Sequence, residues 1–223
     1  RATALNISSL KASTQLVASL HVVPRTLAQT RPSASSDEET RARQSLIQQL
    51  DTGDLPNAIS TGAAAINKWP RDAQLHHYLG LAYFKSGDII HARERLTRAR
   101  DLAPADSATH FDLALVFLSA KDYASAATEL QSAIKSQPSN ALTHVLLGRA
   151  YLNSNRSLQA VDEFKTALKL EPPIKLGHYH LGFAYFSLGR NDEAIAEYRA
   201  ELAASGAHPT VPPERARPLT ETG

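Results

Sequence analysis

Four histidines recur at a fixed spacing of 34 residues and are the side chains best suited to chemistry in this chain. They are His76, His110, His144 and His178. A row of histidines could hold zinc, but zinc needs its ligands to converge on one point at about 2.1 Å. Equivalent atoms in adjacent repeating units lie roughly 10 Å apart, about one helix-packing distance. The spacing therefore favours a structural role, and no metal site is expected.

Two pairs of histidines lie closer together in sequence, and they do not change this prediction. His76 is followed directly by His77, and His178 and His180 are separated by one tyrosine. Adjacent positions on a helix diverge, and positions two apart do not share a face. These pairs therefore do not supply converging ligands.

The rest of the sequence offers little for catalysis. A nucleophile elbow, a phosphate-binding loop and an HExxH sequence are all absent. Asp162–Glu163 and Asp192–Glu193 fall where helices usually carry solvated charge. Paired catalytic carboxylates remain an alternative at these positions. We therefore expect no enzymatic activity and no cofactor.

Composition and charge exclude further classes of protein. The 24 basic and 22 acidic residues nearly balance, so no electrostatic attraction for nucleic acid is indicated. No run of about 18 apolar residues occurs, which excludes a predicted transmembrane helix. The chain has no cysteine, so disulfides and thiolate metal sites are excluded as well. An apolar content of 43% is enough to bury a sizeable core.

The 34-residue period extends well beyond the histidines. Several series of small, aromatic and proline residues share it, and chance does not align so many series. They are Pro70, Pro104, Pro138 and Pro172; Ala58, Ala92, Ala126, Ala160 and Ala194; Ala65, Ala99, Ala133 and Ala167; Gly80, Ala114, Gly148 and Gly182; and Tyr83, Phe117, Tyr151 and Tyr185. A fixed period of this length is typical of an architecture built from stacked units.

These residues resemble the signature of the tetratricopeptide repeat family, whose units are helix–turn–helix pairs of 34 residues. The resemblance covers roughly residues 39 to 208. It implies an all-α fold, a right-handed α-solenoid of about five 34-residue helix-turn-helix units. Residues 39–72 form a degenerate first repeat, and residues 73–208 form four clear repeats. In the last of these, Glu201 and Gly206 replace the later alanine and the proline.

The residue types have physical reasons within such units. Glycine or alanine on the first helix lets the second helix approach closely, as at Gly80 and Gly148. Gly87 suits a left-handed helix end, and Asp88 can cap the helix that follows. Asp106, Asn140 and Asn191 are further candidate caps. Each proline of the series stands where a helix has ended.

The two ends of the chain do not follow the repeat. Residues 1–38 form an N-terminal arm or a signal segment plus a linker. An apolar run from Leu16 to Val23 and a cleavage site near Ala28 would make residues 1–28 an export signal. With such a signal the protein is exported or periplasmic, and otherwise it is cytoplasmic. Residues 209–223 contain four prolines and are predicted to be a disordered tail.

The family resemblance implies that ligands bind along a concave face lined by the first helix of each repeat. The positions that face inward are unusually apolar here, and an exposed apolar stripe usually indicates a partner. The candidate partner-binding residues are His77, Leu81, Phe84, Lys85, Phe111, Leu115, Leu118, Arg149, Leu152, Asn153, Tyr179, Phe183 and Phe186. Alternatively, the N-terminal arm covers the stripe, or the stripe packs inside a tight superhelix.

Some chaperone-binding members of the family hold a peptide's terminal carboxylate with a lysine and an asparagine. Those positions are His77 and Leu81 here, so this clamp is absent and chaperone-tail binding is not predicted. Lys85, Arg149 and Asn153 remain as polar anchors for a peptide. The sequence thus favours a non-enzymatic scaffold that binds another protein or peptide in an apolar groove. The alternative is a structural repeat protein that self-assembles head to tail.

Overall fold

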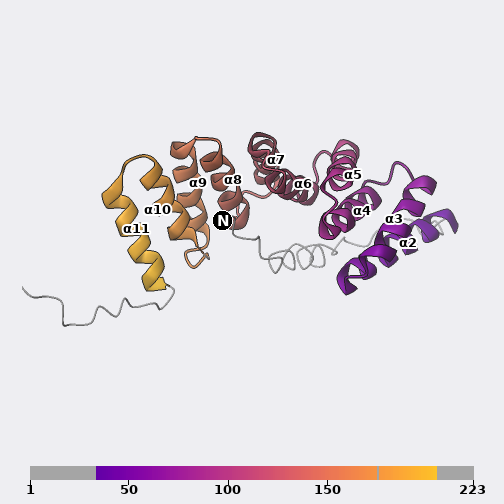
Figure 1. Cartoon of the computed structure of the whole chain (residues 1–223). Helices are drawn as coiled ribbons and strands as arrows, with labels where there is room; N and C mark the ends of the chain where they lie inside the picture. The colour runs from indigo at the N-terminus through magenta and orange to yellow at the C-terminus, as the bar shows by residue number, and fades with distance from the viewer. Residues whose placement is uncertain (1–33, 175, 205–223) are drawn as a thin grey trace, which may run out of the picture. The chain divides into compact units, whose positions relative to one another are not determined.

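The computed structural model describes residues 34–174 and 176–204. Every element in these residues is a helix (Figure 1). The helices are α2 (Ala34–Thr52), α3 (Leu55–Lys68), α4 (Ala73–Ser86), α5 (Ile89–Leu102), α6 (Ser107–Ser119), α7 (Tyr123–Ser136), α8 (Ala141–Asn153), α9 (Ser157–Leu170), α10 (Gly177–Ser187) and α11 (Asn191–Ala204). The predicted all-α repeat fold is confirmed. The predicted signal segment and the predicted tail lie outside the described residues.

Helix ends follow the sequence signals closely. Asp88 caps α5, because its side chain accepts a hydrogen bond from the His91 amide. Asn140 caps α8 in the same way through the Thr143 amide. Gly87 ends α4 with a φ of 87°, the left-handed conformation that glycine adopts without strain. Asn191 differs from the prediction, since it is the first residue of α11 and does not precede it.

The described residues divide into two compact units, one up to residue 113 and one from residue 114 on, with the division inside α6. The core of the first unit joins α2, α3 and α4. Its buried members are Leu46, Leu50, Ala58, Ala65, Leu75 and Ala82. Half-buried residues of α4, among them Tyr78 and Leu81, pack against this cluster. The degenerate first repeat therefore supplies a packing surface for the first clear repeat.

In the second unit, each helix packs on its neighbours from α7 to α11. Close approach between paired helices depends on small residues at the contact. A Cβ atom added to Gly148 would lie 2.6 Å from Cε1 of Phe164, which is fully buried. Such a distance is shorter than any van der Waals contact, so only glycine fits against this ring. The predicted role of this glycine is confirmed.

Candidate partner-binding surface

The periodic histidines bind backbone groups of the loop that precedes each first helix. Nε2 of His76, His110 and His144 lies 3.1, 3.0 and 3.1 Å from the carbonyl oxygens of Pro70, Pro104 and Pro138, respectively. A carbonyl only accepts, so Nε2 carries the hydrogen in each case. The three rings therefore fix the start of a helix to the loop before it. Among the described residues, no group of three or more histidines or acids is arranged to hold a metal ion.

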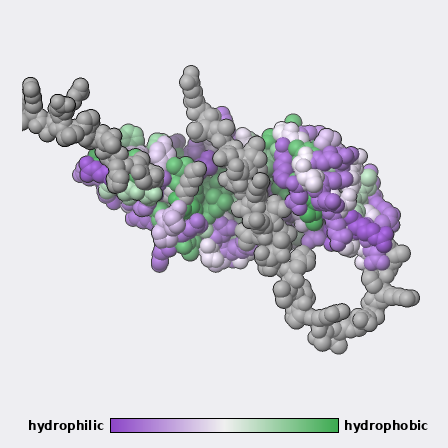
Figure 2. Space-filling view, turned by 90° about the horizontal axis from the view of Figure 1, so that it is seen from below, coloured by the Kyte–Doolittle hydropathy of each residue, from purple (hydrophilic) through white to green (hydrophobic). Residues whose placement is uncertain are grey.

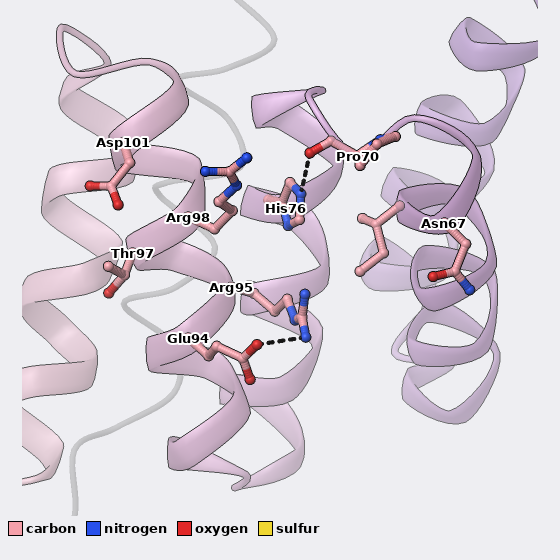
Figure 3. A pocket seen from close by; sticks show the side chains of 9 residues that line it. Asn67, Pro70, His76, Glu94, Arg95, Thr97, Arg98 and Asp101 are labelled. Carbon is pink, nitrogen blue, oxygen red and sulfur yellow. Dashed lines mark hydrogen bonds and ion pairs between the residues drawn. The ribbon is translucent and has the colours of Figure 1, made fainter.

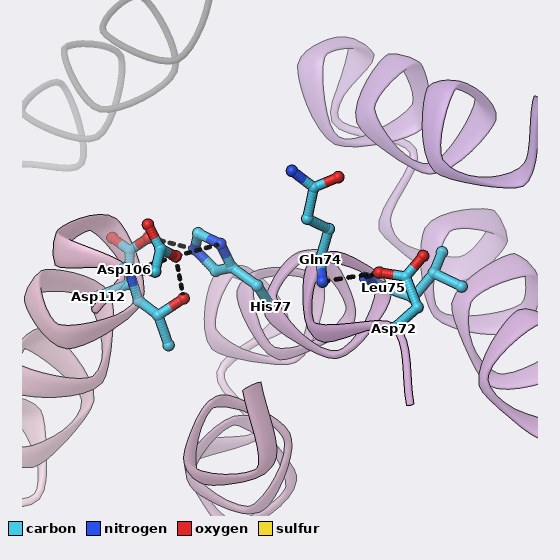
Figure 4. Close-up of polar contacts among 7 residues, drawn as sticks. Asp72, Gln74, Leu75, His77, Asp106 and Asp112 are labelled. Carbon is cyan, nitrogen blue, oxygen red and sulfur yellow. Dashed lines mark hydrogen bonds and ion pairs between the residues drawn. The ribbon is translucent and has the colours of Figure 1, made fainter. Parts of the chain in front are cut away.

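In the first unit, the candidate His77 is buried and already has a partner. Its Nε2 donates to Oδ2 of Asp112 at 2.7 Å, and both residues are less than a tenth exposed (Figure 4). Nδ1 of the same ring lies 4.0 Å from a carboxylate oxygen of Asp106. The ring thus faces two acids of the chain itself. In this conformation His77 presents no surface to a partner.

The other α4 candidates also contact the chain itself. Leu81 packs against the core of the first unit. The Lys85 ammonium donates to the Leu50 carbonyl oxygen of α2 at 3.3 Å. Phe84, one turn along, is half-buried. Because α2 packs on α4, much of the candidate face of α4 is occupied by the preceding repeat.

In the second unit, α10 presents three large aromatic side chains to solvent. Tyr179, Phe183 and Phe186 are 46%, 45% and 59% exposed. They stand four and three residues apart, so they share one face of the helix. The opposite face carries Leu181, Ala184 and Tyr185, which are buried. On the face shown in Figure 2, hydrophobic surface gathers over the region of α8 to α10.

α8 contacts α10, and Arg149 of α8 lies close enough to His180 of α10 for its charge to act on that ring. No carboxylate among the described residues pairs with its guanidinium group, and burial lowers the pKa of Arg149. Burial, with a smaller effect from the Arg149 charge, also lowers the pKa of His180 to about 4. His180 is therefore neutral near pH 7, and its ring stacks on Phe164 with centroids 5.5 Å apart. Arg149 is thus a partly desolvated cation that has no anionic partner in the part of the chain that the structure describes.

The remaining candidates are less exposed or are engaged locally. Phe111 of α6 is half-buried in the first unit. In the second unit, Leu115, Leu118 and Leu152 are also half-buried. The exposed Asn153 amide donates to the Arg149 carbonyl oxygen at 2.8 Å, within α8. Four residues of the predicted set therefore remain as candidates on α8 and α10. Tyr179, Phe183 and Phe186 are exposed, and Arg149 carries a charge that no described carboxylate pairs with.

Sequence reasoning missed the roles of two residues that contact candidate side chains, Asp112 beside His77 and His180 beside Tyr179. Both occupy the same repeat position, where Tyr78 and Leu146 stand in other units. The signal in the sequence is a charged or titratable residue at a repeat position that carries an aromatic or aliphatic residue in the other units. This signal does not identify the contacts of the two residues. Asp112 accepts a hydrogen bond from His77, 35 residues earlier, and the His180 ring stacks on Phe164, 16 residues earlier.

Helix pairs that recur every 34 residues, with small residues at the helix contacts, define a helical-repeat protein of the α-solenoid class. The family model described as tetratricopeptide repeat matches residues 79–141 and 145–209. The chain therefore belongs to the tetratricopeptide repeat family. No curated protein matches the sequence.

Solved structures of MamA share this fold. A crystal structure of MamA is 20% identical, with a TM-score of 0.69 over 72% of this chain and 94% of that one. A MamA AMB-1 structure is 26% identical, with a TM-score of 0.68 over 77% of this chain and 99% of that one. A MamA RS-1 double mutant is 21% identical, with a TM-score of 0.73 over 78% and 98%.

Tetratricopeptide repeats generally act as non-catalytic scaffolds that bind other proteins, and the fold supports this general role here. Within the described residues, no helix combines the length and apolar character required to span a bilayer.

Proposed function

We propose that this protein is a non-enzymatic scaffold that binds an amphipathic helix or an extended peptide on the α8–α10 face. One observation carries the proposal. Three exposed aromatic side chains share a face of α10, and the neighbouring α8 carries an arginine that has no carboxylate partner among the described residues. Monomeric proteins seldom leave a large apolar patch uncovered without a partner for it.

The two kinds of residue have complementary tasks in this proposal. Tyr179, Phe183 and Phe186 are anchors, since aromatic residues dominate the binding energy of protein interfaces. Arg149 binds a carboxylate or a backbone carbonyl of the partner and so sets its orientation. A helical partner with apolar residues three and four positions apart, and one acid nearby, fits both tasks.

Site-specific photocrosslinking tests the proposal. A benzophenone amino acid replaces Phe183 in one variant and the exposed Leu158 of α9 in a matched control. A partner found only with the first variant is then purified. Its affinity is measured for the wild-type chain, for Phe183→Ala/Phe186→Ala and for Ile90→Ala/Leu158→Ala, which removes apolar residues elsewhere that are even more exposed. We expect a loss of affinity of about a hundredfold for the first double variant only.

The proposal is wrong if no partner crosslinks at position 183. It is also wrong if both double variants bind equally well.

A second candidate function is self-association through the last described helix. α11 buries Ala194 but exposes Ile195 at 48%. An end repeat without a polar outer face can add another subunit. Light scattering over a wide concentration range tests this. Self-association predicts a mass that rises with concentration and that Ile195→Glu returns to the monomer value.

A further inference from the structure

A pocket in the first unit is lined by other residues than the α8–α10 face and has a different chemical character. It has a volume of about 450 Å³ and lies where the end of α3, the following loop, the start of α4 and α5 meet (Figure 3). Its lining residues are Ile66, Asn67, Pro70, His76, Glu94, Arg95, Thr97, Arg98 and Asp101. The second helix of the repeat supplies most of these side chains.

His76 leaves one ring nitrogen without a partner at this pocket. The residue is 4% exposed, and its Nε2 donates to the Pro70 carbonyl oxygen. Its Nδ1 is buried and has no hydrogen-bond partner among residues 34–174 and 176–204. Figure 3 places the ring between the Pro70 carbonyl and the arginines of α5. A buried polar atom without a partner is costly, so it requires an explanation.

The equivalent histidines of the second unit show what is missing. Nδ1 of His144 lies 2.7 Å from a carboxylate oxygen of Glu163, and Nδ1 of His178 lies 2.6 Å from one of Glu197. Each glutamate stands 19 residues after its histidine. In the first unit that position is Arg95, so the repeat replaces the carboxylate with a cation.

The acids at the pocket do not compensate for this replacement. Glu94 pairs with its neighbour Arg95 at 2.8 Å, and Asp101 pairs with Arg100 at 2.8 Å. Each pair joins an exposed acid to the half-buried arginine next to it in sequence, and such a surface ion pair contributes little and is easily exchanged. The guanidinium group of Arg98 has no hydrogen bond or ion pair with any described residue. The pocket therefore combines two arginines with a histidine that lacks its carboxylate.

We propose that this pocket binds a carboxylate from an acidic segment of a partner protein, which replaces the glutamate of the later repeats. Arg95 and Arg98 hold the carboxylate by charge-assisted hydrogen bonds. Arg95 swings outward from the His76 ring as it does so. Nδ1 of His76 then takes up a proton and donates it in a hydrogen bond to the carboxylate, as the geometry of His144 and Glu163 illustrates.

Proton uptake makes the binding dependent on pH. In the free protein, burial lowers the pKa of His76, and Arg95 and Arg98 lower it further. The Pro70 carbonyl and Asp72 act in the opposite direction, and Glu94 and Asp101 also line the pocket. A bound carboxylate next to the ring favours its protonated form. Affinity is therefore expected to rise as the pH falls from 8 toward 6.

The probe is an end-capped hexaglutamate peptide, with binding to the intact chain measured by titration calorimetry at low ionic strength. The variant Arg95→Glu introduces the glutamate that the later repeats carry at this position. Its carboxylate then occupies the place proposed for the carboxylate of the partner. Arg93→Glu is the matched control, since it makes the same change of charge at an exposed position of α5 outside the pocket. We expect at least about a tenfold loss of affinity for Arg95→Glu and less than about twofold for Arg93→Glu.

Three further measurements identify the source of the bound carboxylate and test the role of His76 in binding it. Acetate and inorganic phosphate are titrated alone, and affinities equal to that of the peptide would contradict a partner protein as the source. His76→Gln retains a donor for the Pro70 carbonyl and should abolish the pH dependence. Phe183→Ala/Phe186→Ala should leave peptide binding unchanged, which separates this pocket from the proposed α8–α10 face.

The inference is overturned if the wild-type chain does not bind the peptide, or if the two arginine variants lose affinity equally. Circular dichroism and thermal unfolding establish that each variant is folded before binding is measured.

Discussion

α4 in the first unit and α10 in the second carry the same repeat positions, but their candidate residues have opposite surroundings. His77 and Tyr179 are equivalent, as are Leu81 and Phe183. His77 is 6% exposed and bound to Asp112, whereas Tyr179 is 46% exposed. Leu81 packs on a core formed with α2, whereas Phe183 faces solvent. A repeat position thus determines where a side chain is placed on its helix, and the neighbouring helices determine whether a partner can reach it.

The largest expected effect concerns the occupied face. Asp112→Ala removes the only hydrogen-bond partner that the structure gives Nε2 of His77. A buried donor is then left without an acceptor, and we expect unfolding to become easier by about 3 kcal/mol. Urea denaturation followed by circular dichroism measures this change.

Asp112→Asn is the control for that variant, since its amide oxygen still accepts the hydrogen bond. It should cost much less, about 1 kcal/mol. Equal losses for the two variants would show that His77 does not depend on this acceptor. Leu81 and Lys85 would then be the remaining candidates on α4 whose contacts within the chain cover this face.

A second, somewhat smaller effect is expected from His180, which occupies the repeat position of Asp112 but forms no ion pair with any acid in the described residues. Its folded-state pKa of about 4 lies below its ordinary value of 6.5. Between these two pH values the unfolded chain binds more protons than the folded chain. The stabilising contribution is therefore complete above pH 6.5 and is lost as the pH falls toward 4. We expect a total change of roughly 2 to 3 kcal/mol.

Chemical denaturation of the wild-type chain and of His180→Phe at several pH values measures this contribution. The phenylalanine variant should show a shallower decline of stability below pH 6.5. His91→Gln, a change at an exposed histidine, serves as the control. Identical pH profiles for the wild type and His180→Phe would show that His180 is solvated, and that the Arg149 environment is more polar than we infer.

The comparison of α4 with α10 also separates what sequence can predict from what it cannot. The 34-residue period predicted the helix pairs, because small residues must recur wherever two helices approach closely, as at Gly148. Local signals predicted the helix ends at Gly87, Asp88 and Asn140, because capping depends on residues three or four positions apart.

Contacts between helices were harder to predict. The link from His77 to Asp112 spans 35 residues, and the links from His144 and His178 to their glutamates span 19. Such offsets are not characteristic of any single helix or turn. The exposure of the candidate side chains was equally hard to predict, since the sequence of α4 does not reveal that α2 packs on it. The sequence therefore places the predicted concave positions in one set, although α4 and α10 present very different surfaces.

The smallest effects on stability are expected from truncating equivalent residues on α4 and α10. These truncations also test the difference between the two helices most directly. Leu81→Ala should destabilise the fold by about 1 to 2 kcal/mol, because it removes half-buried apolar contacts with the first core. Phe183→Ala should change stability by less than about 0.5 kcal/mol, since the ring is already exposed and alanine favours the helix. Leu158→Ala, at an exposed position of α9, sets the scale for a neutral change.

The two truncations should therefore separate stability from binding. If Phe183→Ala costs as much as Leu81→Ala, the α10 ring is covered in the folded protein, either by another part of the chain or by a second copy. Repeating the denaturation at several protein concentrations separates these cases, because cover by a second copy weakens on dilution. A concentration-independent loss would mean that the two helices differ less than their exposures indicate. The aromatic face would then be part of the fold, and it would not be available to a partner.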